Sequence, residues 1–170
     1  MFIDSHCHLE RFSEQEIEII LEKCKNKNVQ LIITNGIDIK SNRIALSLAE
    51  NFPGIKAALG IYPIDALSLT EKELNEEIKF IKRNKDKIIS VGEVGLDLQE
   101  SSLLEKQKEI LVKFIKLSNK LNRPLTIHSR KAERECAALL EKHKAKKVLM
   151  HHFAGRLTMV TQIVNNGWFL

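Results

Sequence analysis

The sequence has few cysteines and no long apolar run. Its three cysteines, Cys7, Cys24 and Cys136, are odd in number and widely spaced. They indicate neither a disulfide framework nor a paired-cysteine metal site. No segment approaches the roughly 18 consecutive apolar residues of a membrane-spanning helix, and no basic and apolar leader precedes the strand-like Phe2-Ile3. We therefore expect a protein of the reducing cytoplasm that is neither secreted nor membrane-spanning.

Positive charge is in modest excess. The 27 Lys and Arg residues outnumber the 22 Asp and Glu residues, which gives a formal net charge of +5. Much of the excess is lysine spread along helical stretches, as at Lys79, Lys82, Lys85 and Lys87. This is the usual pattern of a solvated helix face. The charge is compatible with a polyanionic partner such as DNA but does not by itself indicate one.

Short apolar runs rich in β-branched residues alternate with longer stretches of helical periodicity. This alternation predicts an α/β fold with a parallel sheet covered by helices. Strands are expected at residues 2–8, 29–35, 55–60, 88–92, 125–128 and 148–151, with a seventh beginning near Trp168. Helices are expected at residues 13–25, 70–83 and 102–121, the first two opened by capping-box spacings.

Six strand-helix units followed by a seventh strand match the beginning of a (β/α)8 barrel of the TIM type. Such barrels usually need about 200 to 250 residues or more. We therefore expect residues 1–170 to form a single domain in which the C-terminal part of the barrel is missing. A complete six-stranded doubly wound sheet is the alternative.

The first strand carries the most informative motif, Asp4-Ser5-His6-Cys7-His8. Residues two apart on a strand project to the same face, so His6 and His8 can reach one ion while Cys7 points to the other side. Cys7 is therefore expected to be a buried structural residue. For an isolated pair, two hydrogen-bonded core histidines would be the alternative to metal ligands.

Ligand-type side chains recur where three later strands end. Glu93 follows an apolar strand between two glycines, His128 ends another, and His151 or His152 ends a third. In parallel α/β barrels the active site forms at the carboxyl ends of the strands, so these side chains are expected to converge. Strand periodicity does not choose between His151 and His152, because both faces of a barrel strand are buried.

Other polar residues fit less well into a site. His143 lies in a lysine-rich helical stretch and is predicted to be a surface histidine. Ser5 and Ser129 each adjoin a histidine, but sequence neighbours on a strand point apart and no nucleophile elbow is present. Arg130 follows His128 and is either a phosphate contact through its planar fork or an exposed cap of the next helix.

The ordered motifs resemble those of the TatD family of metal-dependent deoxyribonucleases, which are amidohydrolase-like barrels. The resembling elements run in order along nearly the whole chain: DSHCHL at the amino end, GIYP near Gly60, VGEVGLD around Glu93, PLTIHSR before Arg130 and HHFAG at His151. The resemblance implies that His6 and His8 bind a first metal, that His128 and His151 bind a second, and that Glu93 bridges the two metals. His152 falls on a variable position of the motif.

The resemblance also implies an activity. Two divalent ions, Mg, Mn or Zn, would activate water for the cleavage of phosphodiester bonds in DNA, most simply in single strands or at chain ends. Glu93 and His128 would be the catalytic residues, and Arg130 and Tyr62 the substrate contacts. Imidazole ligands favour zinc or manganese over magnesium, although the family is usually described as magnesium-dependent.

Two departures from the family pattern matter. Tyr62 stands where the family commonly has a histidine, which is expected to change contacts to a phosphate. The family also supplies an aspartate from a strand beyond this sequence, whose last Asp is Asp97. We therefore expect a truncated gene product, a split protein that a second chain completes, or one portion of a longer protein. The alternative functions are an amidohydrolase acting on a cyclic amide or ester, and a non-catalytic metal-binding scaffold.

Overall fold

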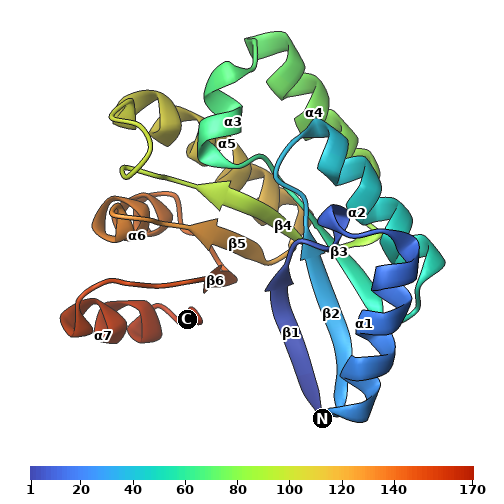
Figure 1. Cartoon of the computed structure of the whole chain (residues 1–170). Helices are drawn as coiled ribbons and strands as arrows, with labels where there is room; N and C mark the ends of the chain where they lie inside the picture. The colour runs from blue at the N-terminus through green and yellow to red at the C-terminus, as the bar shows by residue number, and fades with distance from the viewer.

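The computed structural model describes all 170 residues and contains one parallel sheet of six strands. The strands are β1 (Phe2–Cys7), β2 (Val29–Asn35), β3 (Ile55–Leu59), β4 (Ile88–Gly95), β5 (Leu125–His128) and β6 (Val148–Met150). They pair in chain order, and the sheet curls into a half-barrel (Figure 1). A doubly wound sheet would reverse its strand order. The predicted barrel topology is therefore confirmed, and the doubly wound alternative is wrong.

Helices connect the strands and lie on the outside of the curled sheet (Figure 1). They are η1 (Leu9–Arg11), α1 (Glu14–Asn26), α2 (Ile39–Asn51), α3 (Pro63–Ser68), α4 (Glu71–Arg83), α5 (Leu104–Leu121), α6 (Glu133–Lys142) and α7 (Leu157–Asn165). Both predicted capping boxes are present, at Ser13 with Glu16 and at Thr70 with Glu73. Every helix is too short or too polar to cross a membrane.

The main core lies between the sheet and these helices. Leu111, Phe114 and Ile115 form the inner face of α5 and are buried in one cluster with Val91 of β4 and Leu125 of β5. Their spacing places all three on one side of the helix. This packing holds the centre of the sheet, which carries the most buried part of the site described below.

Strand β4 continues to Gly95, three residues beyond its predicted end. Its outer part is held by pairing of Val94 with Ile127 and of Gly95 with His128, and by the Glu93 amide, which donates to the Gly36 carbonyl at 3.1 Å. The extension has a steric requirement at Gly95, where φ is +156° and a Cβ atom would lie 1.8 Å from the His128 carbonyl oxygen. Glu93 therefore lies within the strand and not after it.

The half-barrel has an open side bounded by β1 and by the chain end. Phe169 pairs with Leu149 of β6, so a seventh strand begins close to the predicted Trp168. Phe2 and Ile3 of β1 are 65% and 53% exposed, and Phe169 is 72% exposed. We call these three residues the apolar rim. The open side of the sheet thus has an unpaired strand edge and large exposed apolar side chains.

Candidate metal centre

Glu93 is the centre of a cluster of four histidines. Its carboxylate is almost fully buried and lies at the carboxyl end of the sheet. One oxygen, Oε2, lies 3.2 Å from His6 Nε2 and 3.3 Å from His8 Nε2. The other, Oε1, lies 2.9 Å from His128 Nδ1 and 2.8 Å from His151 Nε2. The structure thus brings all five predicted ligands together, with two histidines at each carboxylate oxygen.

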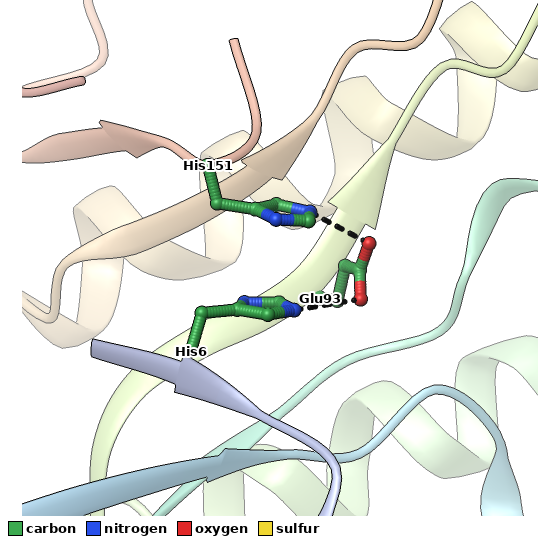
Figure 2. Close-up of side chains that lie close together, drawn as sticks. All are labelled: His6, Glu93 and His151. Carbon is green, nitrogen blue, oxygen red and sulfur yellow. Dashed lines mark hydrogen bonds and ion pairs between the residues drawn. The ribbon is translucent and has the colours of Figure 1, made fainter. Parts of the chain in front are cut away.

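Two of these histidines meet across the open side of the half-barrel. His6 comes from β1 and His151 follows β6, and these two strands are not paired with each other. Their rings nevertheless stack at 3.8 Å between centroids with an interplanar angle of 6°. Figure 2 shows both rings directed at Glu93 from their separate strands. The curl of the sheet therefore brings the ends of the two strands to one point.

The charges in this cluster are strongly coupled. Burial alone would raise the pKa of Glu93, but the hydrogen bonds from His128, His151, His6 and His8 hold it well below its ordinary value. Burial lowers the pKa of His6 despite its contact with Glu93. The pKa of His8 is raised to about 9, because its ring nitrogens contact Glu10 and Glu93. The centre therefore holds an ionised carboxylate in a buried setting.

The donor set fits a divalent cation. Ligand atoms of His6, Glu93 and His151 all lie within 4.8 Å of one another. His6 Nε2 and His8 Nε2 approach to 3.3 Å, so two nitrogens with lone pairs or protons face each other beside one carboxylate. Imidazole nitrogen with carboxylate oxygen is a ligand combination typical of zinc and other first-row divalent ions. A shared cation would satisfy these crowded groups together.

The two adjacent histidines after β6 lie in different surroundings. His151 contacts Glu93, whereas His152 is exposed and has a left-handed backbone with φ of 49°. Cys7 points away from the cluster as predicted, and its thiol lies 3.5 Å from the Ile33 carbonyl oxygen. His143 is half-buried at the end of α6, less solvated than predicted because it caps that helix, and it lies outside the cluster.

Neighbouring groups orient two of the rings from behind. His8 Nδ1 donates to the Asn35 carbonyl at 3.0 Å. His128 Nε2 donates to Asp97 Oδ2 at 2.9 Å, and the Tyr62 hydroxyl donates to the same oxygen at 2.6 Å. Histidines that bind metals usually make such contacts with their second nitrogen. Sequence reasoning missed Asp97, although its spacing of four residues from Glu93 was a usable signal.

The predicted substrate contacts occupy different places. Tyr62 lines a cavity of about 310 Å³ together with His8 and Glu93. Arg130 does not line this cavity, and its guanidinium lies 3.4 Å from Glu100 on an exposed surface. Arg11 does line it, and sequence reasoning missed this residue because it belongs to the short helix η1. A positively charged arginine side chain is therefore present in the cavity, Arg11, and another, Arg130, lies outside it beside Glu100.

The fold and the site together define a class of protein. A parallel βα half-barrel with histidines and a carboxylate at the carboxyl ends of its strands is the architecture of metal-dependent hydrolases. The model of the family described as "TatD related DNase" matches residues 3–170. This chain belongs to that family, as its motifs predicted.

Curated relatives agree with this assignment. The human protein named deoxyribonuclease TATDN3 is 32% identical over 180 residues, in an alignment that covers 98% of this chain and 66% of that protein. The Bacillus subtilis protein named uncharacterized metal-dependent hydrolase YabD is 30% identical, in an alignment that covers 100% of this chain and 68% of that protein. The chain thus spans about two thirds of the length of these relatives.

Solved structures share the fold. The crystal structure of YJJV, a TatD homolog from Escherichia coli, superposes with a TM-score of 0.89 at 29% identity and covers 98% of this chain and 66% of that one. A TatD family hydrolase from Entamoeba histolytica superposes with a TM-score of 0.84 at 24% identity, covering 98% and 63%. The curled sheet is therefore the TIM-barrel type of fold found in these proteins.

Proposed function

We propose that this protein hydrolyses phosphodiester bonds of DNA with divalent metal ions. The observation that carries the proposal is the division of four histidines between the two oxygens of one buried carboxylate, Glu93. The name of the human relative supports DNA as the substrate. The bacterial relatives YabD and YjjV are named uncharacterized metal-dependent hydrolases, which supports hydrolysis with a metal and says nothing of DNA.

The geometry suggests two ions with separate ligand pairs. His6 and His8 would hold one ion with Glu93 Oε2, and His128 and His151 the other with Oε1. Magnesium, manganese and zinc are the candidates, and the nitrogen-rich set favours manganese or zinc. When bound, such ions lower the pKa of coordinated water and stabilise negative charge on a phosphoryl oxygen. Glu93 and His128 are the residues we propose to be catalytic.

The other residues would bind and orient the substrate. The cavity of about 310 Å³ is at the small end of ligand sites. It therefore suits a terminal or unpaired nucleotide better than a duplex. Arg11 and Tyr62 line it and would contact a phosphate there, while Arg130 would meet the strand further out. The free thiols of the chain suit a reducing cytoplasm.

Cleavage of short oligonucleotides tests the function. We expect the protein to release nucleotides from single-stranded DNA with added manganese or zinc, faster than from duplex DNA, and to lose this activity on chelation. The comparison substrates are RNA of the same sequence and cyclic amides. Faster turnover of a cyclic amide would favour another amidohydrolase, and metal binding without any turnover would favour a scaffold.

We also propose that a second polypeptide covers the apolar rim in the working protein. The rim residues Phe2, Ile3 and Phe169 are apolar, exposed and next to unpaired strand edges, which favours pairing with another chain. The isolated 170-residue polypeptide is therefore expected to self-associate at micromolar concentration in sedimentation velocity. Ile3→Lys should reduce this association.

The matched control for the rim is Leu103→Lys, because Leu103 is 57% exposed but lies outside the rim. This variant should sediment like the unmodified chain. A stable monomer at about 100 µM in the unmodified chain would contradict the need for a covering partner.

A further inference from the structure

Asp97 is a fully buried carboxylate behind His128, on the side opposite Glu93. Its Oδ2 accepts hydrogen bonds from His128 Nε2 and the Tyr62 hydroxyl, at 2.9 and 2.6 Å. His128 Nδ1 faces Glu93 Oε1 at 2.9 Å. The imidazole is thus held between two carboxylates. Glu93 belongs to the proposed cation site, whereas Asp97 has no role in the hydrolysis proposed above.

The position of Asp97 is fixed by its backbone. The buried side chain of Gln107 accepts from the Asp97 amide at 2.7 Å and donates to its carbonyl at 3.1 Å. The next residue, Leu98, donates its amide to the Arg130 carbonyl at 3.0 Å. The backbone of Asp97 is therefore held in place at the carboxyl end of the sheet.

The two oxygens of Asp97 have separate tasks. Oδ1 accepts from the backbone amides of Gln99 and Glu100 at 2.8 and 3.0 Å. Only Oδ2 faces His128. A carboxylate only accepts hydrogen bonds, so without a cation Asp97 and Glu93 each favour a proton on the ring nitrogen that faces them. A cation beside Glu93 would take the lone pair of Nδ1, and the single proton of a neutral His128 would then lie on Nε2, facing Asp97.

We propose that Asp97 is a positioning residue that fixes the tautomer of His128, so that Nδ1 is the nitrogen available to a cation at Glu93. This inference rests on the proposed metal site and adds the residue that prepares it. Tyr62 assists by donating its hydroxyl to the same Asp97 oxygen, which helps to hold that oxygen beside His128. Tyr62 thereby has an orienting role in addition to its place in the substrate cavity.

Asp97→Asn gives a sharp test because the structure dictates how the amide will lie. The backbone amides of Gln99 and Glu100 require an acceptor, so the asparagine oxygen takes the place of Oδ1. Its NH₂ group then faces His128 Nε2 and requires that nitrogen to accept. The proton of His128 should move to Nδ1. Binding of zinc through Nδ1 would then leave two donors facing each other.

The measurement is ¹⁵N NMR of the histidine nitrogens together with zinc affinity by calorimetry. In the zinc-loaded chain we expect a proton on His128 Nε2 and none on Nδ1. In metal-free Asp97→Asn we expect the neutral ring to carry it on Nδ1, and zinc affinity should fall roughly 10- to 100-fold, as is typical for groups behind a metal ligand. Circular dichroism checks that the variant is folded.

Two matched variants separate the tautomer from other effects. Asp65→Asn removes a carboxylate from the wall of the same cavity without touching His128 and should change zinc affinity less than about threefold. Tyr62→Phe removes a hydroxyl but leaves Asp97 Oδ2 as the acceptor for His128, so the His128 proton should stay on Nε2.

A zinc-loaded chain with its His128 proton on Nδ1 would overturn the proposal without any variant. Unchanged zinc affinity in folded Asp97→Asn would overturn it as well. Absence of zinc binding in the unmodified chain would overturn the metal site and this inference together. Zinc binding with the expected tautomers but no DNA cleavage would refute the proposed substrate and leave the role of Asp97 standing.

Discussion

Replacing Glu93 with glutamine is expected to abolish metal-dependent DNA cleavage, with a loss on the order of a thousandfold or more. Metal ions contribute several kcal/mol to such reactions, and each 1.36 kcal/mol is a factor of ten in rate. Glutamine keeps the size of the side chain but loses its charge and turns one acceptor into an NH₂ donor. The new NH₂ group would face one of the two histidine pairs, either His6 with His8 or His128 with His151.

The measurement is the initial rate of nucleotide release from single-stranded DNA at saturating manganese, with zinc affinity measured separately. Glu76→Gln is the matched control, because Glu76 lies on the exposed side of α4, and its rate should equal that of the unmodified chain. A Glu93→Gln variant that keeps a tenth or more of the rate would refute the central role of this carboxylate.

Gly95→Ala is expected to destabilise the fold by more than about 4 kcal/mol, which is exceptional for one substitution. The added Cβ would lie 1.8 Å from the His128 carbonyl oxygen, and the backbone φ of +156° disfavours any residue with a side chain. To relieve the contact, β4 and β5 must separate at their carboxyl ends. Glu93, Asp97 and His128 would then be displaced together.

Urea unfolding followed by circular dichroism measures this loss. Gly54→Ala is the control, because a Cβ there would meet its nearest atom, in the Leu21 side chain, at 3.6 Å and its backbone is not left-handed. That variant should stay within about 1 kcal/mol of the unmodified chain. A soluble Gly95→Ala protein with an unfolding midpoint close to that of Gly54→Ala would refute the steric argument.

Much of the fold was predictable because the signals are local. Apolar runs and capping pairs depend only on nearby residues. The apolar runs predicted the ends of all six strands to within three residues, and the capping pairs predicted the starts of α1 and α4. Alternation along β1 put His6 and His8 on one face with Cys7 on the other. The rule that parallel strands end at one edge of a barrel then brought Glu93, His128 and the final histidine together without any knowledge of distances.

The remainder depends on contacts between distant segments. The extension of β4 to Gly95 follows from its close approach to His128, which no local pattern reports. The contact of Asp97 with Tyr62 joins residues 35 positions apart, and Arg11 reaches the cavity only because η1 folds over the end of the sheet. The contact of Arg130 with Glu100 likewise arises from tertiary packing.

The stack of His6 on His151 has a mechanical consequence for the open half-barrel. Cations held by His6 and by His151 against the shared carboxylate of Glu93 would link the first and sixth strands, which share no hydrogen bonds. This link would close a loop of more than 140 residues, a constraint on the unfolded chain comparable in kind to a long-range disulfide. Loss of the ions would remove this link, so we expect the amides at the ends of β1 and β6 to exchange with solvent faster in the metal-free chain.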